Sequence, residues 1–133
     1  MTRVLIVLLL LLAAACSSSP SGREAVPPGE LDRLRAELAA LPGVERASID
    51  YSQGAAVTGL SRLSVRLDVP LGNRPALREP VTRLLWESRI APLDVINYYM
   101  YDGGQEPVDE AVIVTSGDRA AGLRESLGPR PVP

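Results

Sequence analysis

Alternation of apolar and polar residues predicts four short β-strands along the chain. In the clearest run, residues 63–69, leucine or valine at every second position alternates with Ser64, Arg66 and Asp68. Successive side chains of a strand point to opposite sides, so this pattern predicts one buried face and one solvent-facing face. Weaker alternation and clusters of β-branched and aromatic residues mark the other candidates. The four predicted strands are residues 44–52, 63–69, 94–101 and 111–115.

Helical spacing predicts two helices and a third, shorter closing helix. In residues 30–41 four leucines recur at i, i+3, i+7 and i+10, which forms one apolar stripe, and Pro42-Gly43 ends the helix. A second helix begins at about Ala76 or at Pro80 and ends at Ser88, since proline is tolerated in the first turn. The closing helix covers residues 118–127, and Gly128-Pro129 terminates it.

The predicted order of elements is α-β-β-α-β-β with the closing helix at the end. Each helix has an apolar stripe and each strand pair an apolar face, and these must be buried against one another. The economical arrangement is an α+β two-layer sandwich. It has a four-stranded, mainly antiparallel sheet with helices on one face, ferredoxin-like in general plan. Roughly 100 residues are enough for one modest core.

The amino-terminal residues have the composition of an export signal. Arg3 precedes an unbroken apolar run, residues 4–12, which is followed by Ala13-Ala14-Ala15 and Cys16. A basic start, a short apolar stretch and a small-residue exit are typical of secretory signal peptides. As a helix, residues 4–16 would rise about 20 Å, which is short of the roughly 30 Å hydrocarbon core. We therefore expect a signal peptide and not a transmembrane helix.

The three alanines and the cysteine that follows them resemble the lipobox of bacterial lipoproteins. The resemblance implies that the Cys16 thiol receives a diacylglycerol and that Cys16 becomes the mature amino terminus. Ala13 stands where the family usually has leucine. The alternative is ordinary cleavage after Ala15, which would leave Cys16 as a free thiol. Two or three acyl chains would hold the protein on the membrane, because one chain alone binds only marginally.

The lipobox resemblance divides the chain and implies its location. Residues 17–28 are rich in serine and proline and have no apolar period, which favours a flexible spacer. We expect a lipid-anchored protein on the extracytoplasmic face of the cell membrane. The predicted segments are a signal peptide over 1–15, the lipidated cysteine and tether over 16–28, one globular domain over 29–128 and a tail over 129–133.

Composition narrows the chemistry of the domain. The 133 residues contain no His and one Cys, all 14 basic residues are Arg, and 16 acidic residues make the formal charge −2. The commonest general base and metal ligand is therefore absent, and so are Schiff-base and Ser–Lys chemistry. One cysteine supports neither an internal disulfide nor a thiolate zinc site. A near-neutral chain lacks the basic field of a nucleic-acid-binding protein. We expect no enzyme activity, no metal, no cofactor and no nucleic-acid partner.

The acidic residues are the remaining route to catalysis, because two carboxylates can run hydrolysis without histidine. Asp109 and Glu110 are adjacent, so on a strand they point to opposite faces. Glu79 and Glu87 are two helical turns apart, too far to share a proton. Solvated surface acids are the favoured interpretation of both pairs.

Two glycine-containing segments have structural explanations. Gly103-Gly104 lacks the spacing of a phosphate-binding loop and predicts a hairpin turn. Residues 115–118 lack the frame of a nucleophilic serine, and capping of the last helix by Ser116 or Asp118 accounts for them.

The tyrosine-rich stretch near residue 100 is the most informative candidate site. On a strand, Asn97, Tyr99 and Tyr101 share one face, while the more apolar set Ile96, Tyr98 and Met100 packs beneath the helices. The first set would then lie on the open face of the sheet, beside Arg66 and Ser64. Tyrosine is enriched in interfaces, and arginine can stack on it or pair with a carboxylate. Tyr99, Tyr101 and Arg66 are the predicted partner-binding residues, and cross-strand packing alone is the alternative.

Three segments together resemble small lipoproteins of high-GC Gram-positive bacteria. They are the turn Leu41-Pro42-Gly43-Val44, the helix end Trp86-x-Ser88 and the tail Leu127-Gly128-Pro129-Arg130-Pro131. The exclusive use of arginine suits such a source. The resemblance implies no catalytic residues.

Three functional hypotheses follow from these observations. The first is a non-catalytic domain that binds a protein or cell-envelope partner through the tyrosine face. The second is a carrier of a small apolar ligand, for which a cavity lined by Trp86, Leu67 and Tyr98 would be required. The third is a carboxylate-based hydrolase, which needs two carboxylates in one cleft.

Overall fold

The computed structural model describes residues 26–54, 59–70 and 74–132. Its elements follow the predicted order, with the last helix preceded by a short 3₁₀ turn, η1. The elements are α1 (Glu30–Ala39), β1 (Arg46–Ser52), β2 (Arg62–Asp68), α2 (Arg74–Trp86), β3 (Val95–Tyr101), β4 (Asp109–Val114), η1 (Asp118–Ala120) and α3 (Ala121–Leu127). The predicted α+β class is confirmed.

The start of α2 differs from both predicted positions. The helix begins at Arg74, so Pro75 occupies the first turn and Pro80 lies inside the helix. A proline inside a helix lacks the N–H that would bond the carbonyl one turn earlier. Packing of the apolar residues of α2 against the sheet outweighs that loss, since Leu77, Val81 and Leu85 are buried.

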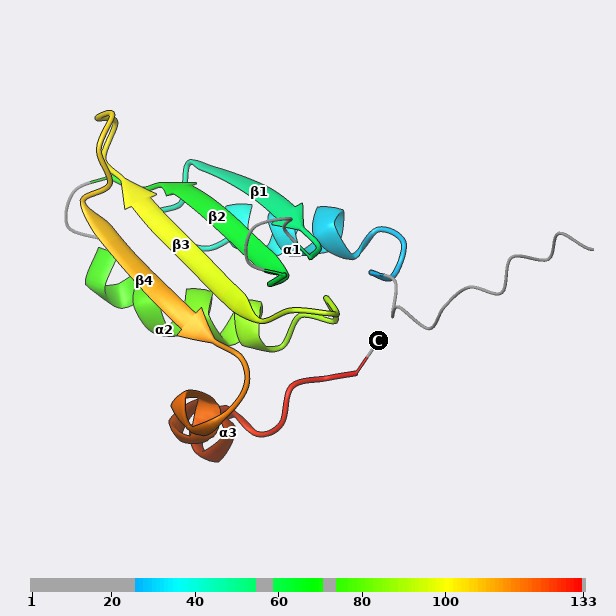
Figure 1. Ribbon diagram of the computed structural model, residues 1–133. Helices are drawn as coiled ribbons and strands as arrows, with labels where there is room; N and C mark the ends of the chain where they lie inside the picture. The colour runs from blue at the N-terminus through cyan, green and yellow to red at the C-terminus, as the bar shows by residue number, and fades with distance from the viewer. Residues whose placement is uncertain (1–25, 55–58, 71–73, 133) are drawn as a thin grey trace, which may run out of the picture.

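The four strands form one sheet in the order β1-β2-β3-β4 (Figure 1). The two outer pairs are antiparallel, which agrees with the predicted mainly antiparallel sheet. The central pair, β2 and β3, is parallel, with Val65 opposite Tyr98 and Arg66 opposite Tyr99. Parallel neighbours need a crossover connection, and α2 supplies it. The alternation pattern specified the faces of the strands but not which strands are neighbours.

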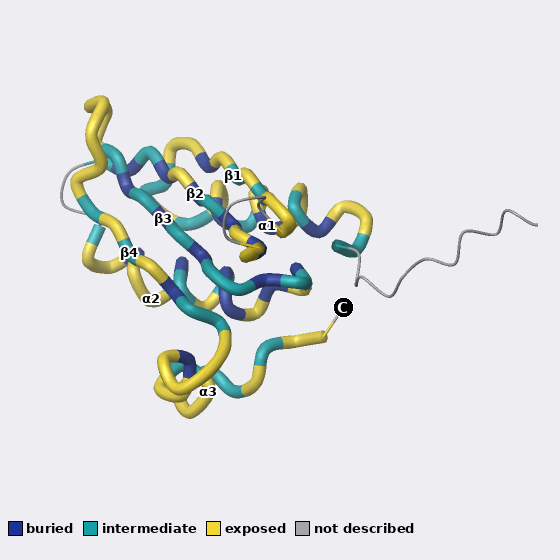
Figure 2. The backbone as a smooth tube through the Cα atoms, in the orientation of Figure 1, coloured by how far each residue is buried: buried dark blue, intermediate teal, exposed yellow. Residues whose placement is uncertain are grey.

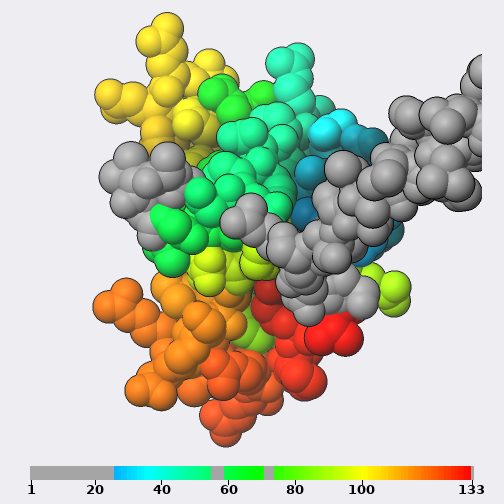
Figure 3. Space-filling model, turned by 45° about the vertical axis from the view of Figure 1, so that its right-hand side comes forward, coloured from blue at the N-terminus to red at the C-terminus, as the bar shows by residue number. Residues whose placement is uncertain are grey.

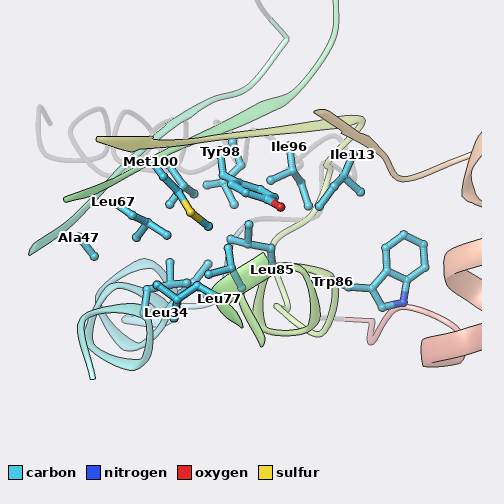
Figure 4. Close-up of a cluster of buried hydrophobic side chains, with 14 of the residues drawn as sticks. Leu34, Ala47, Leu67, Leu77, Leu85, Trp86, Ile96, Tyr98, Met100 and Ile113 are labelled. Atoms are coloured by element: carbon cyan, nitrogen blue, oxygen red, sulfur yellow. The ribbon is translucent and has the colours of Figure 1, made fainter. Parts of the chain in front are cut away.

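Helices α1 and α2 cover one face of the sheet, as expected for a two-layer sandwich (Figure 1). Along β3 the residues alternate between buried and half-buried, which is visible as dark blue and teal segments in Figure 2. The buried set includes Ile96, Tyr98 and Met100, so the prediction that they pack beneath the helices is confirmed. They meet leucines of both helices in the core (Figure 4). The opposite face carries no described helix (Figure 1).

A buried carboxylate ties α1 to the segment that follows α2. Glu30 is only 6% exposed. Its carboxylate accepts hydrogen bonds from Arg33 Nη2 at 2.6 Å, from Arg33 Nε at 2.9 Å and from the backbone N–H of Arg89 at 2.7 Å. The Arg33 bonds, followed by the Arg89 N–H, lower the pKa of Glu30 against the opposing effect of burial. The ionised carboxylate therefore stabilises the folded state.

The carboxyl-terminal segment is held against the end of α2 (Figure 3). Trp86 Nε1 donates to the carbonyl of Gly128 at 2.9 Å. Arg130 donates through Nε to the carbonyl of Trp86 at 3.1 Å and through Nη2 to those of Ser88 at 3.0 Å and Ile90 at 3.2 Å. Burial lowers the pKa of Arg130. Arg130, in the segment predicted to be a tail, thus contacts the domain through three carbonyl groups.

Both ends of the described chain lie at one end of the sheet, and the β3–β4 hairpin lies at the opposite end (Figure 1). The strands run between these two ends. Tyr101 ends β3 at the hairpin end, and its register partner on β2 is Asp68.

We expect Glu30→Gln to lower the free energy of unfolding by about 1–3 kcal/mol at pH 7, because Arg33 and the Arg89 N–H lose a charged acceptor. The folded-state pKa lies below the unfolded value of about 4.3, so the contribution of the charge is complete above that pH and is lost as pH falls through the folded-state pKa. The difference in free energy of unfolding between wild type and Glu30→Gln should therefore shrink below about pH 4.3. Urea unfolding followed by Trp86 fluorescence measures it.

Glu37→Gln is the matched control, because Glu37 binds the same Arg33 at 2.6 Å but its side chain is 40% exposed. An exposed ion pair contributes about 0–1 kcal/mol. An equal decrease in the free energy of unfolding in Glu30→Gln and Glu37→Gln would contradict the structural role of Glu30.

We expect Arg130→Ala to lower the free energy of unfolding by about 1–3 kcal/mol, because it removes charge-assisted hydrogen bonds to three carbonyl groups. Arg130→Lys should recover only part of the loss, since an ammonium group lacks the planar fork. Urea unfolding followed by circular dichroism measures both. Arg124→Ala on α3 is the control, because this exposed side chain makes one bond, to the Gly117 carbonyl at 2.7 Å. A larger decrease in the free energy of unfolding in Arg124→Ala than in Arg130→Ala would contradict the stabilising role of Arg130.

Candidate functional site

The candidate site is the face of the sheet that the described helices leave uncovered. Strand register places Tyr99 at its centre, between Arg66 on β2 and Glu110 on β4. Asn97 lies between Ser64 and Val112 in the next row. The predicted neighbours of the tyrosine set, Arg66 and Ser64, are therefore confirmed as its register partners.

Arg66 is held in place by two contacts. Its guanidinium carbon lies 3.8 Å from the centroid of the Tyr101 ring. Its Nε donates to Asp68 Oδ1 at 3.3 Å, and the Arg66 side chain is still 49% exposed. An arginine stacked on an aromatic ring gains a cation–π attraction and loses less freedom when it meets a ligand. The three predicted binding residues thus form one connected cluster, which we call the Arg66–tyrosine cluster (Arg66, Tyr99 and Tyr101).

The uncovered face has an apolar half and a charged half. Over β3 and β4 the outward residues include Tyr99 and Tyr101, and Val112, which is 66% exposed. Over β1 and β2 they are mainly serine and charged residues. The charged residues of the whole face are Arg46, Arg62, Arg66, Asp50, Asp68 and Glu110. These charges balance, so the face exerts little long-range steering, and recognition there depends on contact.

Sequence reasoning missed Val112. The residue lay within a predicted strand, but its outward position beside Asn97 depends on the pairing of β3 with β4. An apolar strand residue predicts a buried face until the register is known. No local signal in the sequence distinguished it from its buried neighbour Ile113.

The acidic pairs do not form a hydrolytic site. Asp109 accepts two hydrogen bonds from Arg78 of α2, on the helix side of the sheet, whereas Glu110 is exposed beside Tyr99. The prediction that adjacent acids point apart is confirmed. Glu79 lies 3.2 Å and Glu87 4.0 Å from nitrogen atoms of Arg83, so both are surface ion-pair partners.

Of the predictions for the two glycine-containing segments, the hairpin turn is confirmed and the helix cap is wrong. Gly103 has a φ of 99° in the connection between the antiparallel strands β3 and β4, so the hairpin prediction is confirmed. The capping prediction is wrong, because Gly117 precedes η1 and neither Ser116 nor Asp118 caps it. With a φ of 68°, Gly117 supplies the sharp change of direction that starts the turn.

The residues named for an apolar cavity belong to the packed core (Figure 4). Leu67 and Trp86 are fully buried and Tyr98 is 3% exposed. All three belong to the same cluster of buried hydrophobic residues.

Cys16 lies outside the described residues. Over residues 26–54, 59–70 and 74–132, no helix is both long and apolar enough to cross a bilayer. In the same part of the chain, His, Cys, Asp and Glu side chains do not gather in groups of three or more that could bind a metal ion.

Comparison of the chain with protein-family models, curated protein sequences and solved structures gave no match.

Proposed function

We propose that this protein is a lipid-anchored, extracytoplasmic lipoprotein whose domain binds a protein of the cell envelope and performs no catalysis. The binding surface is the uncovered face of the sheet, with the Arg66–tyrosine cluster at its centre. The observation that carries the proposal is the stacking of Arg66 on Tyr101 at 3.8 Å, on a face that no described helix covers.

The cluster has the physical properties of a contact surface. Tyrosines supply a large contact area with only two side-chain torsions to immobilise, and the strand already fixes their backbone. Ordering an arginine at an interface costs about 0.5–1.5 kcal/mol, and the contacts of Arg66 with Tyr101 and Asp68 reduce that cost beforehand.

The partner should match both halves of the face. An apolar side chain of the partner would pack between Tyr99 and the exposed Val112. A carboxylate of the partner would meet the outer nitrogens of Arg66, since Asp68 bonds only Nε. Polar and charged groups would surround this centre, as they do at the rim of protein interfaces.

The membrane attachment rests on the amino-terminal sequence. Ala13-Ala14-Ala15-Cys16 resembles a lipobox, and the serine- and proline-rich residues that follow suit a tether. Twelve residues, 17–28, reach about 40 Å at most, which would keep the domain near the bilayer. The net negative charge of the chain does not favour anionic lipid, so acyl chains would provide the attachment.

We expect Tyr99→Ala and Arg66→Ala each to reduce recovery of a cross-linked partner at least about tenfold, because a central interface residue contributes about 2 kcal/mol or more. Cross-linking in intact cells with a photoreactive amino acid at position 112 measures the recovery. Val112 is exposed on the same face, so the probe lies within the proposed contact area.

Arg35→Ala is the matched control. Arg35 lies on α1 in the other layer, forms a comparable ion pair with Asp32 at 3.0 Å and is 47% exposed. Arg35→Ala should leave recovery of the cross-linked partner unchanged. Unchanged recovery in Tyr99→Ala and Arg66→Ala, with normal protein levels, would refute the proposed binding face.

We expect Cys16→Ser to release the exported protein from the membrane, because serine has no thiol to accept a diacylglycerol. Intact-mass measurement of membrane-extracted wild type should give the mass of the chain from Cys16 plus two or three acyl chains. An unmodified Cys16, or a Cys16→Ser protein that remains bound to the membrane as firmly as wild type, would contradict the anchor.

A further inference from the structure

The outer edge of β4 carries backbone groups that the sheet does not use. β4 is the last strand of the described sheet, and its partner there is β3 (Figure 1). Just beyond β4, Thr115 donates its N–H to the carbonyl of Asp94, the residue opposite it, at 3.1 Å. Residues of antiparallel strands alternate between turning their backbone groups toward the paired strand and turning them away. Glu110, Val112 and Val114 therefore turn their N–H and C=O groups outward.

These outward groups have no hydrogen-bond partner in the part of the chain that the structure describes. An open strand edge can pair with a strand of another chain, and proteins often protect such an edge with proline or lysine. The sequence of β4 contains neither residue. Glu110 and Val112 are both exposed. The edge of β4 is therefore open to a short extended segment, whose backbone would supply the missing hydrogen bonds.

The apolar residues near this edge distinguish it from the other edge of the sheet, β1. Among the described residues, the large hydrophobic side chains that remain exposed include Val112 of β4 and Val108 just before it, and none belongs to β1. Val112 is 66% exposed, beside the outward backbone groups. A segment paired with β4 would cover this side chain with one of its own.

The charge at the start of β4 favours a basic segment. A groove of about 480 Å³ lies there, lined by Glu106, Pro107, Val108, Asp109 and Glu110. Asp109 is paired with Arg78, whereas Glu106 and Glu110 have no ion-pair partner within the described residues. Opposite charges on directly opposed strand residues stabilise the pairing of two strands, and like charges weaken it. A basic side chain opposite Glu110 would complement this negative charge.

We propose that the envelope partner adds an extended segment to the outer edge of β4, with a basic residue opposite Glu110 and an apolar residue opposite Val112. The backbone of β4 holds the segment, and alternate side chains of the segment lie on the uncovered face. Glu110 is the register partner of Tyr99, so these side chains lead toward the Arg66–tyrosine cluster. This inference rests on the proposed function, because the segment belongs to the same partner.

Cross-linking in intact cells tests the backbone pairing, with the photoreactive amino acid moved to position 108, where the native valine is 42% exposed. Val112→Pro removes an outward N–H, and proline is tolerated on edge strands whose N–H faces solvent. We expect recovery of the cross-linked partner to fall about tenfold or more, because a carbonyl of the partner loses its donor.

Val112→Ala is the matched control for Val112→Pro. Alanine removes more of the side chain than proline does but keeps the N–H, so it should reduce recovery of the partner clearly less. Circular dichroism confirms that each variant is folded. If Val112→Pro does not fold, the charge variant below decides the question.

Glu110→Lys tests the charge without altering the backbone. We expect recovery of the partner to fall about threefold or more, because a basic residue of the partner would then face a like charge. Asp50→Lys is the control, since it makes the same change at an exposed position of β1, on the opposite edge of the sheet, and should leave recovery unchanged. Mass spectrometry of the cross-linked peptides should identify a partner segment that contains arginine or lysine.

Three results would overturn the strand pairing. They are equal recovery in wild type and Glu110→Lys, equal decreases in Val112→Pro and Val112→Ala, and a cross-linked product that consists of two copies of this chain. If Tyr99→Ala and Arg66→Ala still reduce recovery in such a case, the proposed binding face stands and only the strand pairing fails.

Discussion

The parallel pairing of β2 with β3 is the constraint on which the rest of the structure depends. Parallel neighbours need a long connection, and α2 provides it by crossing one face of the sheet. This crossing buries the leucines of α2 against the strands, in the same core as residues of α1. It also sets Arg66 opposite Tyr99, so one pairing decides both where the core forms and which residues meet on the uncovered side.

The two faces of β3 illustrate how one short segment serves two environments. Ile96, Tyr98 and Met100 are buried among helix side chains, while Asn97, Tyr99 and Tyr101 remain half-buried on the other side. Tyrosine suits both positions, because its ring packs like a hydrocarbon and its hydroxyl requires a polar neighbour or water. The uncovered face therefore presents aromatic surface, whereas on the helix side the ring of Tyr98 belongs to the core.

Local pattern predicted much of this fold and part of the candidate site. The strict alternation over residues 63–69 predicted a strand whose Leu63, Val65 and Leu67 are buried, and the tyrosine stretch predicted which side chains share each face. The strand order and the parallel centre did not follow from the sequence, because alternation specifies the face of a residue and not its neighbour. Val112 was missed for that reason.

The contacts of the chain ends required the three-dimensional structure. In the sequence, Glu30 looks like an ordinary acidic residue in the first turn of a helix. Only the position of Arg89 in the structure shows that Glu30 connects α1 to the segment after α2. Arg130 belongs to a proline-rich end whose composition predicts a tail, yet its guanidinium bonds three carbonyls, that of Trp86 at the end of α2 and those of Ser88 and Ile90 after it. Both residues act over long sequence separation, which no local spacing rule detects.

The placement of the chain ends has a consequence for how the domain would be presented at a surface. The described chain begins at one end of the sheet, and the β3–β4 hairpin occupies the other (Figure 1). Arg66 and Tyr101 lie toward the hairpin, in the rows next to the end of β3. A domain held by its amino terminus would therefore carry the stacked pair on the half of the sheet face farther from the bilayer, where the bilayer does not obstruct an approaching molecule.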